Sequence, residues 1–164
     1  MEDDSEEVVA LHIGYVPDPA VSGAVLFQTE ESCFLTFNAL KPVKTGSFEP
    51  AGIALIEFKG CIITQFGYPN DEAYQGHPLF AKIQSLGKEA TGIHEVHHSR
   101  WLRRLVVQNG KSFPEGTPWK DSRHFIIEFH DSSFECLAES FHIELIEGPY
   151  ESILSHIAKR AMSE

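Results

Sequence analysis

Short apolar runs separated by turn residues fill the first part of the chain. Within each run apolar and polar residues tend to alternate, and the runs are rich in Val, Ile, Phe and Thr, which favours strands over helices. The polar stretch 29–31 and Gly60 lie where hairpin turns would join neighbouring runs. The pattern predicts five strands, at residues 8–16, 23–28, 32–40, 53–59 and 61–66.

Two amphipathic stretches in the second half predict helices. In the first, at residues 99–109, Ser99 is a suitable N-cap and Trp101 belongs to an apolar stripe expected to face the core. The second helix is expected at residues 150–162. Apolar runs predict further strands at 124–130, 134–138 and 141–146. Consecutive strands with few intervening helices indicate an α+β fold with a mainly antiparallel β-sheet of about seven to eight strands.

The composition is that of a globular domain. The chain has 164 residues, of which 42% are apolar and 23% charged, and one core can form at this length without disulfides. No apolar run approaches the roughly 20 residues that cross a bilayer, and the acidic start is unlike a secretory signal. We therefore expect a disordered acidic N-terminus at 1–7, a single α+β domain at 8–164, a cytoplasmic location and no membrane partner.

Acidic residues outnumber basic ones, and the formal net charge is −11. Residues 82–123 contain most of the Lys and Arg residues of the chain. In residues 124–158, by contrast, Asp and Glu occur without any Lys or Arg. A protein this acidic repels phosphate backbones, so sequence-independent binding to nucleic acid is disfavoured. A basic protein is the better electrostatic partner, although the need for solubility also explains an acidic surface.

The three cysteines, Cys33, Cys61 and Cys136, are far apart in the sequence, and each lies in an apolar run. Their odd number and the absence of a CxxC spacing argue against a disulfide framework or a zinc finger. We expect buried free thiols in a reducing compartment. Strand alternation places Cys136 on an apolar face, where a neutral thiol is a poor nucleophile.

The segment 67–78 interrupts the strand pattern with Gly, Pro and Asn. It contains two tyrosines, two carboxylates and an imidazole, which favours a binding role because binding residues gather in loops that a rigid sheet supports. The alternative is that the tyrosines only anchor the loop to the core. The binding candidates from this loop are Tyr68, Asp71, Glu72, Tyr74 and His77.

The segment 123–138 predicts a hairpin with an acidic face. With a two-residue turn at 131–132, Glu128 directly faces Glu135. Like charges opposite each other destabilise a sheet unless a cation, a basic residue or a raised pKa compensates. Divergent pKa values are how acid and base roles arise, so Glu128, Glu135 and His130 form the favoured acidic site. The alternative is that both glutamates point into water.

The sequence HEVHH, which begins at His94, contains the HExxH pattern. On a helix, His94 and His98 share a face and can hold zinc while Glu95 activates a bound water. The surrounding residues also fit an extended chain, in which these two histidines are ~13 Å apart. A looser site would join His97 or His98 to His77 or a carboxylate. The metal candidates are His94, His97 and His98, with zinc or another divalent metal as the cofactor.

Two stretches resemble a set of uncharacterised bacterial proteins. They are GYPNDEA at 67–73, which continues to GHPLF at 76–80, and HFIIEFHDSSFECLA at 124–138. The resemblance implies no activity. It indicates only that the two stretches belong together.

No Walker loop, dinucleotide-binding glycine motif or serine-hydrolase elbow occurs in the sequence. This favours a non-enzymatic cytosolic binding protein that presents an acidic sheet face to a basic protein, as inhibitors of basic toxins or nucleases do. Enzymatic activity stays open, because the alternative is a metal-binding domain or a metal-dependent hydrolase. That alternative uses histidines of segment 94–98 together with His and Glu residues of the hairpin at 124–138.

Overall fold

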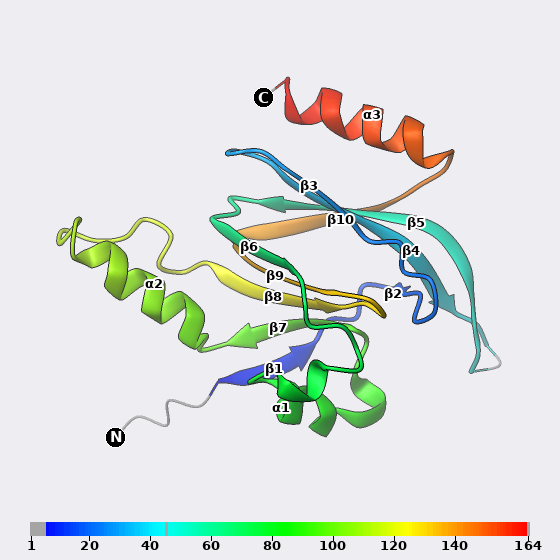
Figure 1. Ribbon diagram of the computed structural model, residues 1–164, viewed down its shortest axis with the longest axis horizontal. Coiled ribbons are helices and arrows are strands. Elements are labelled where there is room, and N and C mark those ends of the chain that lie inside the picture. The colour runs from blue at the N-terminus through cyan, green and yellow to red at the C-terminus, as the bar shows by residue number, and fades with distance from the viewer. Residues whose placement is uncertain (1–5, 45, 164) are drawn as a thin grey trace.

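Two antiparallel β-sheets pack face to face in the computed structural model, which describes residues 6–44 and 46–163 (Figure 1). The first sheet has the strand order β1 (Glu7–Ala10), β7 (Ile93–His97), β8 (Arg123–Glu128), β9 (Ser133–Ala138) and β6 (Ile63–Gly67). The second sheet has the order β10 (Ser140–Ile146), β5 (Phe48–Lys59), β4 (Cys33–Pro42) and β2 (Val16–Pro17), and β3 (Val25–Gln28) also pairs with β4. The described residues form a single α+β domain, which confirms the predicted fold class.

The main core lies between the two sheets. Strand alternation directs Phe125, Ile127 and Phe134 of the first sheet toward Phe37 and Phe58 of the second. The ring of Phe58 lies 5.2 Å from that of Phe134 and 5.8 Å from that of Phe125, measured between centroids. Full burial of a large apolar side chain contributes about 1.5–3 kcal/mol, so this layer is a major source of stability.

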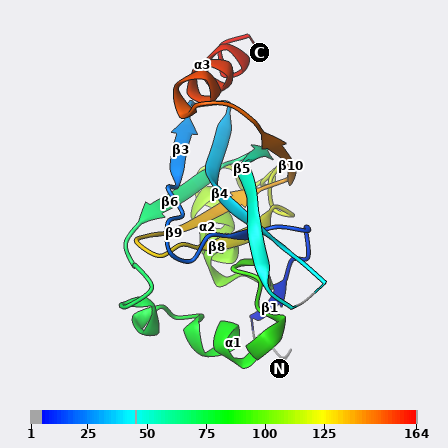
Figure 2. The same cartoon turned by 90° about the vertical axis from the view of Figure 1, so that its right-hand side faces the viewer.

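Helix α3 (Tyr150–Ala161) covers the outer face of the second sheet and confirms the predicted C-terminal helix (Figure 2). Ile153 and Ile157 are fully buried against apolar residues of β4 and β5. Near the end of the helix, Arg160 pairs with the buried carboxylate of Glu57. The helix is therefore attached by an apolar stripe and by an ion pair.

A segment that the sequence pattern did not predict as helical covers the outer face of the first sheet. It contains the 3-10 turns η1 (Tyr74–Gly76) and η2 (Gly87–Glu89) and the short helix α1 (Phe80–Ser85). Leu79 and Ile83 pack on apolar residues of β1, β7 and β8. Figure 2 shows the resulting order of layers as α3, second sheet, first sheet and α1.

Helix α2 (Arg100–Gly110) follows β7 and lies at one end of the first sheet (Figure 1). As predicted, its N-cap Ser99 accepts a hydrogen bond from the backbone N–H of Leu102, at 3.1 Å. Trp101 is half-buried and does not belong to the core, which corrects the prediction made from its apolar stripe. No described helix is long and apolar enough to cross a membrane.

The hairpin of β8 and β9 differs from the predicted register by two residues. The turn lies one residue earlier than predicted, at 130–131. Glu128 therefore faces Ser133, and Glu135 faces Ile126. Because a shift of two residues preserves the face of every side chain, the predicted apolar face is confirmed. The predicted direct opposition of the two glutamates is wrong.

The N-terminal part of the chain begins the first sheet. The predicted strand at 8–16 is in fact divided between β1 and β2, which belong to different sheets. Residues 1–5 of the predicted disordered terminus lie outside the described residues. Glu6 accepts a hydrogen bond from the backbone N–H of Arg100 at 2.7 Å, and Glu7 starts β1, so these two residues are ordered.

Candidate ligand-binding site

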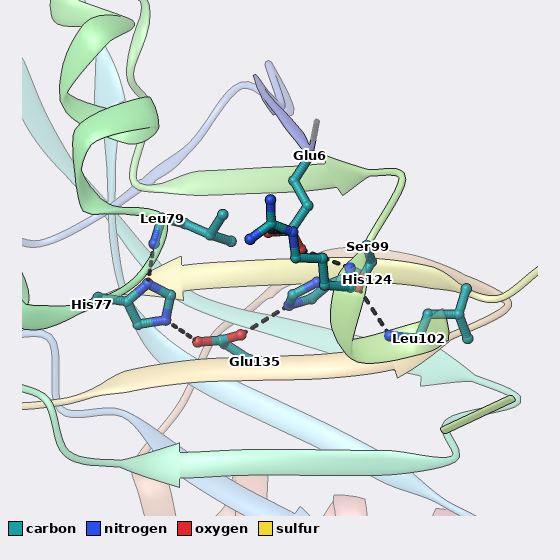
Figure 3. Close-up of polar contacts among 8 residues, drawn as sticks. Glu6, His77, Leu79, Ser99, Leu102, His124 and Glu135 are labelled. Atoms are coloured by element: carbon teal, nitrogen blue, oxygen red, sulfur yellow. Dashed lines mark hydrogen bonds and ion pairs between the residues drawn. The ribbon is translucent and has the colours of Figure 1, made fainter. Parts of the chain in front are cut away.

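Glu135 on β9 is held between two histidines from different parts of the chain (Figure 3). Nε2 of His77, which precedes α1, hydrogen-bonds Oε1, and Nε2 of His124, on β8, lies 2.8 Å from Oε2. The residue Glu135 is 8% exposed, and His124 is 3% exposed. Both oxygens of a nearly buried carboxylate are thus paired, as burial of a charge requires.

Neighbouring groups determine which nitrogen of each histidine carries the proton. The backbone N–H of Leu79 donates to Nδ1 of His77 at 3.1 Å, so the proton of this ring is on Nε2. Nδ1 of His124 lies 2.9 Å from the hydroxyl of Ser99, which accepts from the backbone of α2 and has its own proton to donate. We therefore assign each ring as a donor of Nε2–H to Glu135.

The carboxylate of Glu135 is ionised at neutral pH. Burial raises its pKa, but hydrogen bonds from His124 and His77 outweigh that effect, and the pKa falls to about 2. A carboxylate has about four lone-pair positions, and the two imidazoles occupy one on each oxygen. The remaining positions are available to a ligand.

These three residues line a pocket of about 380 Å³, which lies within the roughly 300–1,000 Å³ range of small-molecule sites. Part of the wall is apolar, and the ring of Trp101 meets His124 edge-on with centroids 5.2 Å apart. The other lining residues are Pro78, Leu79, Gln65, Glu6, Arg100 and Arg104. The pocket therefore combines a fixed carboxylate, an aromatic wall and two guanidinium groups.

The two arginines of the pocket lie one helical turn apart on the same side of α2. Nε of Arg100 is 3.7 Å from Oε2 of Glu6, so this guanidinium is partly compensated. Arg104 is exposed and has no ion-pair partner within residues 6–44 and 46–163. These side chains provide positive charge at the outer part of the pocket.

A second polar cluster lies beside the first under the same cover. Tyr74 stacks on His77 with ring centroids 4.9 Å apart, and its hydroxyl finds no hydrogen-bond partner in the described part of the chain. The same holds for both nitrogens of His94, although its Nδ1 is 3.4 Å from Oε2 of Glu128. Burial raises the pKa of Glu128 to about 7 and lowers that of His94 to about 4. The pKa values of Glu128 and Glu135 are therefore shifted in opposite directions, and the two carboxylates have different partners.

The loop and the hairpin that the sequence marked separately lie together in the structure. The backbone N–H of Asp71 donates to the carbonyl oxygen of His130 at 3.0 Å, and the Asp71 carboxylate is 2.6 Å from Nδ1 of the same histidine. Two other candidates from this loop, Tyr68 and Glu72, are exposed and do not join the buried network. The loop thus contributes Tyr74 and His77 to the buried clusters.

The HExxH pattern lies on strand β7 and not on a helix, so the extended alternative is the observed one. His94 is fully buried under the α1 segment, whereas His97 lies on the opposite side of the strand with a side chain 45% exposed. His98 follows the strand in a left-handed conformation with φ of 56°. The structure therefore does not bring the three metal candidates together. Among the described residues, no group of three or more His, Cys, Asp or Glu is placed to hold a metal ion.

Several pocket residues were not predicted as site residues. The sequence did contain a signal for His124, because strand alternation places it on the same face as Glu128. The observed register then makes His124 a diagonal neighbour of Glu135. No such signal existed for Arg100 and Arg104, since the position of a helix relative to a sheet cannot be read from the helix sequence alone.

Ser99, His124 and Glu135 form a chain of contacts like that of a Ser-His-acid hydrolase, but the serine is not placed to react. The residue is 4% exposed, and its hydroxyl oxygen already caps α2. It also lines a different pocket from the one that contains Glu135. A nucleophilic hydroxyl needs access to the substrate, so Ser99 serves to orient His124.

No protein-family model, curated protein or solved structure matches the chain. Function is therefore inferred from the geometry of the pocket.

Proposed function

We propose that the protein is a non-enzymatic binding protein whose pocket takes a small zwitterion of the amino-acid class. The ammonium group of the ligand donates to Glu135, and its carboxylate faces Arg104 and Arg100. The observation that carries the proposal is the buried carboxylate of Glu135, each of whose oxygens is hydrogen-bonded by one imidazole.

The cationic half of the ligand follows from the charge at Glu135. His77 and His124 each direct one Nε2 atom at this carboxylate, and its remaining lone pairs can accept hydrogen bonds from a cationic donor. An ammonium group brings three donors and a compensating charge, and buried charges are favourable only when paired. The ring of Trp101 offers an additional cation–π surface.

The anionic half follows from the arginines. Arg104 has no ion-pair partner in the described part of the chain, and Arg100 is held only loosely, at 3.7 Å, by Glu6. Guanidinium groups bind carboxylates through paired hydrogen bonds. A ligand with both charges is therefore complementary to the pocket from end to end.

A binding role is favoured over catalysis because neither imidazole that lines this pocket has a free nitrogen. Both nitrogens of His77 and of His124 have hydrogen-bond partners, which leaves no imidazole lone pair for proton abstraction. The carboxylate of Glu135, with a pKa of about 2, is a weak base.

The basic protein partner predicted from the net charge would have to insert one side chain, because Glu135 is only 8% exposed. Arg100 and Arg104 would also repel a basic surface at the outer part of this pocket. We therefore favour a small ligand over a protein face. The cytoplasm is the proposed location, since its reducing conditions suit free cysteines.

The test is a titration of the purified full chain with L-leucine and L-phenylalanine, followed by amide NMR and tryptophan fluorescence. The amides of these amino acids keep only the positive charge, and the N-acetyl forms keep only the negative one. We expect the zwitterions to bind more tightly than either derivative. Glu135→Gln should weaken binding about 10–100-fold, as the loss of a charge-assisted hydrogen bond predicts.

The matched control is Glu128→Gln, which changes the same residue type on the same hairpin outside this pocket. It should bind like the wild type. Binding that is equal in wild type and Glu135→Gln, or absent for every compound, would reject the proposal. Binding of a lysine-rich peptide at Glu135, with no response to the free amino acids, would favour the basic protein partner instead.

The metal-binding alternative remains a separate hypothesis. Metal analysis of protein purified without an affinity tag, repeated on His97→Ala and His98→Ala, decides it. Stoichiometric zinc in the wild type that is lost in these variants would support the alternative.

A further inference from the structure

A second pocket lies at the end of the first sheet that is away from α2, beside the turn between β8 and β9 (Figure 1). Its volume is about 340 Å³, which also lies within the roughly 300–1,000 Å³ range of small-molecule sites. Strand β2, the loop before η1, residues 90–92 and the β4–β5 hairpin contribute to its wall. It shares no lining residue with the pocket that contains Glu135, so the two sites are separate.

Most of this wall is apolar. Pro17 approaches the backbone at Gly92 so closely that a Cβ atom there would lie 3.3 Å from Cδ of the proline ring. Phe48 is 54% exposed, so its ring has apolar surface that a ligand can cover. The other apolar side chains of the wall are those of Val16, Pro19, Leu40, Ala90 and Phe129. A wall of this kind favours a hydrocarbon group.

Three polar side chains line the same pocket, and one of them has no hydrogen-bond donor. Asp71 and His130 pair with each other at 2.6 Å. No residue in the described part of the chain donates a hydrogen bond to the carboxyl group of Glu128, whose side chain is 28% exposed. None of the described lining residues is Lys or Arg. The pocket therefore presents an accessible carboxyl group without a basic side chain to compensate it.

A buried histidine next to Glu128 also lacks a partner. His94 is 0% exposed, and neither of its nitrogens forms a hydrogen bond with the described residues. Its Nδ1 lies 3.4 Å from Oε2 of Glu128, so an ionised Glu128 can accept from this ring. Burial favours the protonated form of Glu128 and raises its pKa to about 7. A cation in the pocket would stabilise the carboxylate and with it the contact to His94.

We propose that this second pocket binds a small primary amine with an apolar tail, whose ammonium group donates to Glu128 and whose tail packs against Leu40 and Phe48. The class is a simple amine and not a zwitterion, because a ligand carboxylate would find no counterpart of Arg100 and Arg104 here. This site is independent of the function proposed for the pocket at Glu135.

The test titrates the purified full chain at pH 8 with hexylamine, hexanol and hexanoate, which share one tail and differ in charge. Amide NMR follows Thr91 and Gly92, which line the pocket. We expect hexylamine to bind at least about 10-fold more tightly than hexanol, and hexanoate not to bind. Glu128→Gln should weaken hexylamine binding about 10–100-fold, as the loss of a charge-assisted hydrogen bond predicts.

Two further variants separate the ends of the ligand. Phe48→Ala should weaken binding of hexylamine about 2–10-fold and leave that of methylamine unchanged, because only the longer amine covers this ring. Glu139→Gln removes an exposed glutamate of the neighbouring strand end outside the pocket, and it should bind hexylamine like the wild type.

The pH dependence gives an independent readout. An alkyl ammonium group stays protonated to about pH 10, whereas Glu128 must lose its proton to pair with it. Affinity for hexylamine should therefore rise about 10–30-fold between pH 5.5 and pH 8. The rise should disappear in Glu128→Gln.

The groups around Glu128 do not reverse this direction. They are His94 on β7, Tyr74 in η1, His77 directly after η1, and Asp71 and His130 beside the pocket. Burial lowers the pKa of His94 to about 4 and raises that of Tyr74, so both stay neutral in this range. Loss of the positive charge of His130 with rising pH would also favour a cation. His130→Gln should therefore keep most of the pH dependence.

The proposal is wrong if hexylamine does not bind, if it binds equally well to Glu128→Gln, or if hexanol binds as tightly. It is also wrong if the pH dependence is lost in His130→Gln and kept in Glu128→Gln. Binding of Nα-acetyl-lysine amide without a response to hexylamine would overturn it in favour of a lysine side chain of a protein. Amine binding in a protein that binds no amino acid would support this inference and reject only the function proposed above.

Discussion

At the scale of single residues, the two glutamates of one hairpin face show how local partners decide acid–base behaviour. Glu135 receives two imidazole N–H groups and is ionised, whereas Glu128 lies 3.4 Å from Nδ1 of His94 and burial raises its pKa to about 7. Residues of one type on one sheet face therefore differ because hydrogen bonds, and not burial alone, determine which form is stable.

Removal of the Glu135 charge should change the acid stability of the fold. Between pH 4.5 and about 2 the unfolded chain binds more protons than the folded one, so the free energy of unfolding falls as the pH drops. The shift of Glu135 corresponds to about 3 kcal/mol across this window. Denaturant titrations at several pH values should show that the free energy of unfolding falls less with decreasing pH in Glu135→Gln than in the wild type. An unchanged pH dependence in the variant would contradict the buried network.

Glu128→Gln should have the opposite effect on pH dependence. The folded wild type holds a proton on Glu128 that the unfolded chain releases, so the free energy of unfolding falls as the pH rises from 4.5 to about 7. The neutral glutamine removes this penalty, and the variant should gain at most about 3 kcal/mol over the wild type above pH 7. The same titrations measure it. A variant less stable than the wild type at pH 8 would mean that the Glu128 carboxylate is bound by a cation.

At the scale of elements, α2 connects helix capping to the pocket. Ser99 ends the turn after β7, accepts from the backbone of Leu102 and contacts Nδ1 of His124. The position of Trp101 against His124 follows directly from where the helix starts. A single cap therefore determines both the start of the helix and the orientation of one pocket wall.

Ser99→Ala should lose the cap and the partner of His124 together. The expected cost is about 1–3 kcal/mol, since a lost N-cap costs about 1 kcal/mol and a buried nitrogen is left without a partner. Ser99→Thr keeps the hydroxyl and should remain close to the wild type. Chemical denaturation measures the stability, and nitrogen NMR of the imidazole reports whether His124 keeps its tautomer. A Ser99→Ala variant as stable as the wild type would contradict this role.

Alternation and capping predicted most strands, both long helices and the inward face of the hairpin, because these depend on local periodicity. Helix α1 was missed because it has six residues and no side-chain cap hydrogen bond at Leu79. The loop residue His77 and the hairpin residue Glu135 were both chosen from the sequence, but their contact depends on long-range packing. The pairing of Glu135 with His124 needed the register, which a turn shifted by one residue alters.

At the scale of the whole molecule, the cover formed by η1 and α1 is linked to the hairpin turn through Asp71 and His130, whose side chains are 48% and 43% exposed. The hydrogen bond and charge of Asp71 raise the pKa of His130. This contact joins two segments that lie 59 residues apart in the sequence.

The link should therefore weaken as the pH rises. A raised folded-state pKa means that the interaction is fully present below the unfolded pKa of the histidine and is lost as the pH passes the folded value. NMR titration should give a higher pKa for His130 in the wild type than in Asp71→Asn. Hydrogen exchange of residues 70–90 should also speed up in that variant. Identical titration curves would show that the contact does not form in solution.

The strand order of the first sheet has a consequence for how the protein is made. β4 and β5 are neighbours in the sequence and can pair early, whereas β1 pairs with β7, whose residues follow after most of the second sheet. Contacts between distant segments form slowly because the intervening chain must first be ordered. On the ribosome, β1 has no partner until His97 has left the exit tunnel. We therefore expect β2 to β5 of the second sheet to assemble during translation, whereas the first sheet with its pocket, and the edge strand β10 of the second sheet, join only afterwards.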